Sequence, residues 1–208
     1  MLRAWANIDG VSTTTATAPY SCDGTNVTVV LDAHRYLVGH IVNVTAPGLN
    51  GQYGALNTGG NYQITSVTPS TFTFSSTNMF RNATGFATSG ATNGILTITN
   101  SVIRGSSGIH SVAKTQVSSS GYATGNYAVN LETEMPDTNY CCSAATSWLD
   151  NLSANIISIA TRWHGASTNE YGVVNPTKTS IHVCTLNRDY GTPSNPYNAN
   201  YIMVSFFR

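Results

Sequence analysis

Apolar and polar side chains alternate in the central stretch of the chain, residues 104–140. Apolar side chains stand at every second position at Tyr127, Val129 and Leu131. A period of two predicts a strand that buries one face and exposes the other. The segment before it carries isolated apolar residues in a polar run, a pattern that also fits an extended, half-buried segment. The centre of the chain therefore predicts two strands.

The residues around these two strands predict how they are connected and where they end. Gly121 and Gly125 lie between the strands and are typical of a turn. Met135-Pro136-Asp137 follows the second strand, and proline cannot donate a backbone hydrogen bond to a sheet. We therefore expect a β-hairpin that is stopped by this tripeptide and acts as the scaffold of its domain.

Short apolar segments bounded by Gly, Pro or Asn recur along the rest of the chain and predict further strands. The first, residues 1–10, contains Trp5 and is expected to end in a turn at Asp9-Gly10. The last, residues 201–208, is almost wholly apolar, which predicts burial on both faces, in a core or between subunits. The others lie at residues 25–31, 41–53, 61–67, 68–76, 94–103, 141–148, 155–163 and 180–186.

The composition fits a protein built of strands and turns. Only 9% of the 208 residues are charged, against about 25% in ordinary globular chains. Thr, Ser, Asn and Gly fill the deficit, together with 11 Tyr. Thr and Tyr favour strands, whereas Asn and Gly favour turns. The fold class that follows is all-β, with neutral polar faces.

The charge balance narrows the possible partners. Lys+Arg and Asp+Glu both number 9, the net charge is zero, and the basic residues form no cluster. We therefore expect no nucleic-acid partner. A neutral surface has little charge repulsion against self-association, which favours a subunit of an assembly over a free enzyme. A neutral monomer is an alternative that composition leaves open.

Targeting segments and cysteine sites are not indicated. The N-terminal residues lack the apolar segment of a secretion signal, and no run of about 18 apolar residues could insert into a membrane. The cysteines lack zinc-ligand spacing, and we expect all of them to be reduced, buried and structural. They are Cys22, Cys141, Cys142 and Cys184.

Two groups of residues are candidates for a functional site, a histidine pair for a metal site and a carboxylate pair for glycoside hydrolysis. His34 and His40 flank a turn near Asp32, but lone histidines more often satisfy turns than bind a metal. Glu132 and Glu134 would share a strand face about 7 Å apart, within the range of an inverting glycoside hydrolase. A solvated outer face explains the two carboxylates better. We assign no metal and no cofactor.

Catalytic motifs do not occur in the sequence: there is no nucleophile elbow, phosphate-binding loop, dinucleotide fingerprint or zinc-protease motif. We therefore assign no catalytic residue and expect the protein not to be an enzyme. Aromatic residues of the later segments are the candidate receptor contacts, because such side chains supply contact area at low entropic cost. They are Trp163, Tyr171, Tyr190 and Tyr197. Packing at a subunit interface is the competing interpretation, and it is favoured for Trp163.

Residues 24–88 resemble a small β module that is common in bacteriophage virion proteins. The matching segments are Val27-Thr28-Val29, Ala33-His34, Val38-Gly39, Leu49-Asn50-Gly51, Ile64-Thr65-Ser66-Val67 and Thr71-Phe72-Thr73-Phe74. Arg35-Tyr36, where a small residue is usual, and an extra loop at residues 54–61 depart from the module. The resemblance implies that His34 has a structural role in closing a turn.

The beginning and the second half of the chain resemble a terminal β-domain of marine and cyanobacterial phage structural proteins. The residues that carry this resemblance are Arg3-Ala4-Trp5, Asn7, Gly10, Ile103-Arg104, Gly108-Ile109, Ser111-Val112, Gly125, Tyr127, Val129-Asn130, Met135-Pro136-Asp137 and Asn139-Tyr140. The two resemblances together imply an outer antiparallel β-sandwich, residues 1–11 and 99–208. A small β-barrel-like module, residues 12–98, is inserted into it, as chain entropy tolerates well.

The function that these resemblances imply is that of a virion surface structural protein, assembled in the host bacterial cytoplasm. A tail-fibre or receptor-binding role in host attachment is the first expectation, with other virion proteins and a host polysaccharide or receptor as partners. A capsid decoration, cement or head-fibre protein is the alternative, because the outer domain begins directly after Met1. A polysaccharide-degrading tailspike ranks third. By analogy with phage fibres we expect a homotrimer, on whose axis His110 is a further candidate ion ligand.

Overall fold

The structure is a computed structural model. It describes residues 1–23, 26–45, 60–79, 92–114, 126–147, 154–159, 162–164, 171–173, 177–188, 195–196 and 201–208. These residues form strands and turns without a helix, which confirms the all-β prediction. Within the same residues, no helix exists that is long and apolar enough to cross a membrane.

The described part of the chain contains fifteen strands. Those of the first half are β1 (Leu2–Cys22), β2 (Asn26–Val30), β3 (Ile41–Thr45), β4 (Gly60–Val67), β5 (Thr71–Met79), β6 (Thr92–Ser107) and β7 (Ile109–Lys114). Those of the second half are β8 (Asn126–Leu131), β9 (Cys141–Ser147), β10 (Ala154–Ile159), β11 (Arg162–His164), β12 (Tyr171–Val173), β13 (Ser180–Arg188), β14 (Asn195–Pro196) and β15 (Tyr201–Phe207).

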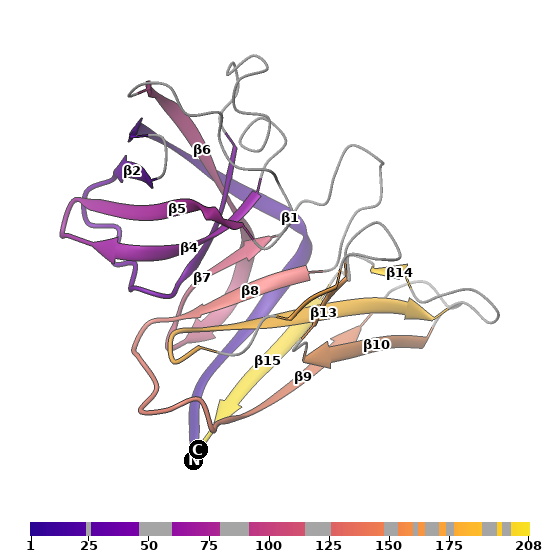
Figure 1. The fold of residues 1–208 in the computed structure, drawn as a ribbon. Helices are drawn as coiled ribbons and strands as arrows, with labels where there is room; N and C mark the ends of the chain where they lie inside the picture. The colour runs from indigo at the N-terminus through magenta and orange to yellow at the C-terminus, as the bar shows by residue number, and fades with distance from the viewer. Residues whose placement is uncertain are drawn as a thin grey trace.

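Six strands close a barrel, in the order β1-β2-β5-β4-β3-β6, because β6 pairs again with β1. The sheet continues beyond the barrel on both sides: β7, β8, β13 and β10 follow from β6, whereas β15 and β9 follow from β1. β14 pairs with β13, and β11 and β12 form a separate two-stranded sheet. In Figure 1, β1 runs from the chain ends, beside β15, up to the barrel strands.

Apolar side chains from alternate strand positions fill the barrel, because residues two apart on a strand point to the same face. Tyr62, Phe72 and Phe74 supply the largest fully buried rings, and the centroids of Tyr62 and Phe74 lie 4.5 Å apart. The remaining members of this cluster are Ala18, Tyr20, Cys22, Val27, Val29, Tyr36, Val42, Val44, Ile64, Leu96 and Ile98. The small module therefore contains a closed barrel.

A second hydrophobic cluster lies in the sandwich-like part of the molecule outside the barrel. It joins the start of β1, β7, β8, β13 and β15. Its buried members are Ala4, Ala6, Ile8, Ile109, Val112, Tyr127, Val129, Leu131, Met135, Ile181, Val183, Ile202, Val204 and Phe206. The expected central hairpin is present here, since β7 and β8 pair antiparallel from Ile109–Leu131 to Lys114–Tyr127. The expectation that its second strand exposes one face is wrong, because Ala128 and Asn130 are buried on the other side of β8.

β1 and β6 contribute to both clusters. Ala4 of β1 belongs to the second cluster and Ala18 of the same strand to the barrel, while Ile103 and Ile98 of β6 divide in the same way. The division into an inserted domain, residues 12–98, and an outer domain, residues 1–11 and 99–208, stays a prediction. The two hydrophobic clusters separate near those boundaries, but two continuous strands cross them.

The expected end of the first strand at Asp9-Gly10 is wrong. β1 continues to Cys22, and its pairing with β6 skips between Asp9 and Thr13. Asp9 Oδ1 accepts hydrogen bonds of 2.9 Å from the backbone N–H groups of Val11 and Ser12. The local turn chemistry of aspartate therefore occurs, but pairing with β6 on both sides converts the turn into a bulge.

Two expectations concern burial. Within one chain β15 buries only one face: Ile202, Val204 and Phe206 face the core, while Met203 and Phe207 are 54% and 37% exposed. Burial of the other face between subunits stays a prediction. One face is left open because β15 pairs laterally with β1 and β9 and packs on the core only with alternate residues. Cys22 is buried as expected, but Cys141 is exposed, since it starts the edge strand β9 on its outward side.

Candidate functional site

Asn130 joins the barrel to the second cluster. Its side-chain Oδ1 accepts a hydrogen bond of 2.9 Å from Ile41 N–H, and its Nδ2 donates to the Ile41 carbonyl at 2.7 Å. Nδ2 also donates to Ser111 Oγ at 2.9 Å. Asn130 is completely buried. Its amide thus replaces a peptide group of a neighbouring strand and satisfies both backbone groups of Ile41.

His40 lies at the same joint and is completely buried. Its Nε2 donates to the Leu131 carbonyl at 2.8 Å, and its Nδ1 accepts from Leu37 N–H at 3.2 Å. This pattern defines a neutral ring. Burial lowers the pKa of His40 to about 3, helped by the nearby His110 and opposed by the Leu131 carbonyl.

His34 and His110 extend this joint. His34 Nε2 lies 2.9 Å from the carbonyls of Thr68 and Thr71. The ring therefore holds the turn before β5, which is the kind of structural role that the resemblance implies. His110 Nε2 donates to the His34 carbonyl at 2.7 Å, and burial lowers the pKa of His110. Tyr36 packs between the rings, with its centroid 4.7 Å from that of His110. Aromatic contacts of this kind rigidify a junction.

A metal site at these histidines is not supported by their contacts. Both ring nitrogens of His34, His40 and His110 make hydrogen bonds within the protein. Across the residues whose positions the structure describes, no three His, Cys, Asp or Glu side chains are grouped as a metal would require. The histidines form a neutral joint that fixes the barrel on the second cluster.

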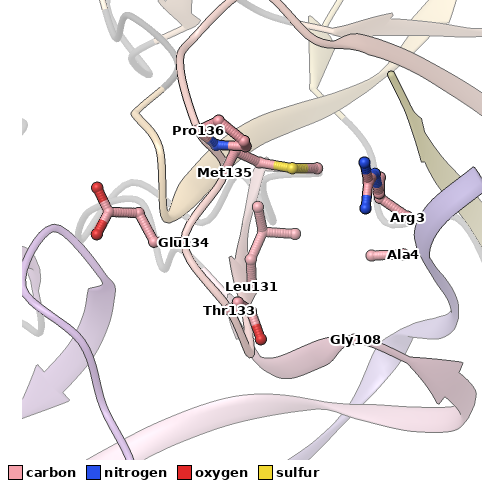
Figure 2. A pocket seen from close by; sticks show the side chains of 8 residues that line it. All are labelled: Arg3, Ala4, Gly108, Leu131, Thr133, Glu134, Met135 and Pro136. Atoms are coloured by element: carbon pink, nitrogen blue, oxygen red, sulfur yellow. The ribbon is translucent and has the colours of Figure 1, made fainter.

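A cavity of about 320 Å³ opens on the other side of the hairpin. Its lining comes from the start of β1, from the β6–β7 turn and from the segment after β8. The lining residues are Arg3, Ala4, Gly108, Leu131, Thr133, Glu134, Met135 and Pro136. Figure 2 shows the Met135 side chain extending across the opening toward the Arg3 guanidinium. The size is at the lower end for a small-molecule site.

The backbone walls of this cavity are held in place without a ligand. Glu132 N–H donates to the Gly108 carbonyl at 2.9 Å, and Met135 N–H donates to the Lys178 carbonyl at 2.7 Å. Gly108 has φ +69°, and a Cβ there would lie 3.1 Å from both the Arg3 carbonyl oxygen and the Ala4 Cβ. A side chain at this position would be strained and would push β1 and the turn apart, so glycine suits this close approach.

Arg3 and Glu134 are the charged residues of the lining. Glu134 lies 3.5 Å from Lys178, and in Figure 2 its carboxylate turns away from Arg3. Among the described residues Arg3 takes part in no ion pair; the pairs are Arg104–Asp9, Lys178–Glu134 and Arg208–Asp137. The cavity therefore combines an apolar floor with one uncompensated cation at its rim.

The predicted contact residues lie elsewhere. Trp163 is in β11 and Tyr171 in β12, and these strands pair with each other, His164 opposite Tyr171. Tyr190 and Tyr197 lie outside the described residues. The structure thus brings the backbones of two of the four candidates together and does not place the other two.

The carboxylate pair considered for glycoside hydrolysis does not share a strand face. β8 ends at Leu131, so Glu132 and Glu134 lie in the segment that follows. Both are exposed. Glu132 N–H still donates to the Gly108 carbonyl, directly before β7, but Met135 N–H donates to the Lys178 carbonyl, so the segment leaves the β7–β8 pairing. The shared strand face from which their separation was expected is therefore not formed.

Comparisons with known proteins found no matching family model, curated protein or solved structure. In the sequence, Arg3 and Gly108 stand out only as carriers of the resemblance to phage structural proteins, and Met135 also as part of the tripeptide that ends the hairpin. Their places in the resembling motifs are the signal that could have pointed to a shared structural feature. Sequence spacing could not have connected them, because Arg3 is about a hundred residues from the other two.

Proposed function

We propose that this chain is a non-enzymatic bacteriophage virion surface protein that mediates attachment to the host cell. The observation that carries the proposal is the placement of the motif residues. Ala4 comes from the start of the chain and Gly108, Ile109, Asn130 and Met135 from the central hairpin, yet all line or support the second cluster and its joint to the barrel. Motif residues that pack together in one part of the fold support the resemblance of this domain to the terminal β-domain of phage structural proteins.

A rigid, charge-poor body suits attachment. The neutral joint at His40 and Asn130 holds the barrel on the second cluster, and candidate contact strands β11 and β12 lie apart from the main sheet. Rigid scaffolds that carry aromatic contact residues lose little entropy on binding. Trp163 and Tyr171 remain our candidates for the receptor contact.

Competition for adsorption tests the attachment role. Purified chain, added before virions that carry it, should reduce their adsorption to host cells, because it occupies the same receptor. A double variant, Trp163→Ala with Tyr171→Ala, should compete less well, whereas Tyr36→Phe, inside the joint, should compete like the unaltered chain. Undiminished adsorption in the presence of excess folded chain would contradict attachment.

Decoration of the capsid is the second candidate, and the outer face of β1 and β15 favours it. Leu2 and Phe207 are register partners, and Met203 lies on the same outward face of β15 as Phe207. Leu2, Met203 and Phe207 are 49%, 54% and 37% exposed. Apolar side chains gathered on one sheet face mark a contact surface. Gel densitometry of purified virions separates the candidates, since a decoration protein is present in far more copies than a tail protein.

In the attachment role we place the contact between the copies of a trimer on this same outward face, which a decoration protein would turn toward the capsid instead. Met203→Asp should then shift the chain toward monomer in light scattering after size-exclusion chromatography. Ile95→Asp is the matched control, because Ile95 is similarly exposed, at 55%, on β6. Equal oligomer fractions in both variants would exclude this face, and a monomeric unaltered chain would exclude the assembly.

A further inference from the structure

The cavity beside Arg3 differs from the rest of the surface in charge and in shape. Leu131, Ala4 and Met135 are 1%, 4% and 5% exposed and form an apolar floor. Arg3, which is exposed, supplies a guanidinium at the rim. We propose that this cavity is a binding site for a small organic carboxylate whose apolar body rests on the floor while Arg3 pairs with the carboxylate. The inference goes beyond the proposed function and does not depend on it.

Charge complementarity identifies the ligand class. A guanidinium presents parallel N–H donors that match the two oxygens of a carboxylate. Glu134, the other charged residue of the lining, lies 3.5 Å from Lys178. The negative charge of Glu134 is therefore balanced by Lys178 and not by Arg3. A cationic ligand would be repelled by Arg3, which has no ion pair among the described residues. A neutral apolar ligand would gain nothing from Arg3, because this exposed side chain stays hydrated.

The shape of the cavity supports binding without rearrangement. The segment after β8 is tied to the Gly108 and Lys178 carbonyls, and Gly108 lets the turn lie directly against β1. A cavity whose walls are already in position loses little entropy on binding. The exposed hydroxyl of Thr133 adds a polar group on the lining, and Met135 adapts its flexible side chain to the ligand body.

The methionine methyl groups provide a direct measurement. The chain has 4 Met; Met135 lines the cavity, whereas Met203 is exposed on the outward face of β15. In a sample with ¹³C-labelled methionine methyl groups, hexanoate should shift the Met135 signal in a saturable manner and leave the Met203 signal in place. Acetate, which lacks the apolar body, and hexanol, which lacks the charge, should each require at least tenfold higher concentration.

Charge variants separate this site from a non-specific apolar cavity. Arg3→Gln should weaken hexanoate binding at least tenfold, because it removes the charge-assisted pair. Arg3→Lys, which keeps the charge without the planar fork, should recover part of the affinity. Arg35→Gln is the matched control, since Arg35 is also exposed but lies in the β2–β3 segment, and it should bind like the unaltered chain.

Each result decides the inference. A Met135 shift that saturates with hexanoate, and that weakens in Arg3→Gln but not in Arg35→Gln, supports it. It is overturned if hexanol matches hexanoate, if the affinity of Arg3→Gln is unchanged, or if no Met135 shift occurs well above millimolar hexanoate. Because Arg3 is exposed, all variants should retain the methyl spectrum of the folded chain, which checks that the fold is intact.

Discussion

Substitution of Asn130 by alanine should destabilise the whole fold. The side chain is completely buried and makes three hydrogen bonds, two of them to the backbone of Ile41 and one to Ser111. Alanine removes the amide and leaves the N–H and the carbonyl of Ile41 without these partners in the interior. No neighbouring strand can replace the amide, because at that point β3 faces the side chain of Asn130 and not a backbone.

The expected magnitude follows from these orphaned groups. A buried donor or acceptor that loses its partner costs about 1–3 kcal/mol. Two such groups give about 2–6 kcal/mol, a large fraction of the roughly 5–15 kcal/mol that stabilises an ordinary domain. Asn130→Asp should be at least as harmful at neutral pH, because a carboxylate accepts from Ile41 N–H but repels the Ile41 carbonyl. Acidification should partly rescue this variant, since the protonated acid can donate again.

Urea unfolding followed by tryptophan fluorescence measures the loss. Asn139→Ala is the matched control, since Asn139 is exposed, and it should change the free energy of unfolding by less than about 0.5 kcal/mol. If Asn130→Ala lost less than about 1 kcal/mol, the joint would not contribute as described. If Asn130→Asp gained no stability on acidification relative to the unaltered chain, the proposed donor role of Nδ2 would be wrong.

Three further predictions concern pH, the β6–β7 turn and the barrel core. Burial lowers the pKa of His40 to about 3 and that of His182 to about 4, while an unfolded histidine protonates near pH 6.5. The unfolded chain therefore binds more protons below about pH 6.5, so the free energy of unfolding should be level above that pH and fall as the pH drops toward 3. A urea midpoint that stays constant from pH 7 to pH 4 would contradict this, and His40→Gln should show a shallower fall. Gly108→Ala should lose about 1–3 kcal/mol, because alanine at φ +69° also meets the backbone of β1 at 3.1 Å. In the same urea assay Gly105→Ala is its control, with its nearest contact at 3.4 Å to a ring atom, and equal losses in both would refute the explanation. Phe72→Ala should lose about 3–5 kcal/mol, because Phe72 is fully buried in the barrel; a thermal midpoint near that of the unaltered chain would show that the barrel core adapts.

The strands themselves could be predicted from the sequence. Alternation at Tyr127, Val129 and Leu131 predicted the position of β8 and one face that it buries, but the other face, with Ala128 and Asn130, is buried as well. The Thr-Phe repeat predicted the buried face of β5, with Phe72 and Phe74. The alternation is a local property, because successive side chains of a strand point to opposite faces whatever its neighbours are. Whether both faces are buried depends on the tertiary structure. Composition with few charges and many β-forming residues was sufficient for the all-β class.

Pairings between distant strands required the tertiary structure. Asp9-Gly10 has the local chemistry of a turn, and only the return of β6 alongside β1, on both sides of Asp9, makes it a bulge within a longer strand. In the same way the alternation of β8 predicted that Asn130 would point away from Val129, but not that it would meet Ile41. Such contacts depend on strand register, which pairs residues far apart in the chain.

The candidate cavity shows the same division between sequence and structure. The sequence by itself determined which residues carry charge, which are apolar and which glycine can take a positive φ. The tertiary structure alone brought Arg3, Gly108 and Met135 to one opening and left Arg3 without an ion pair among the described residues. The physical reason is that strand formation follows from local side-chain alternation, whereas a cavity is formed by the packing of segments that have no relation in sequence.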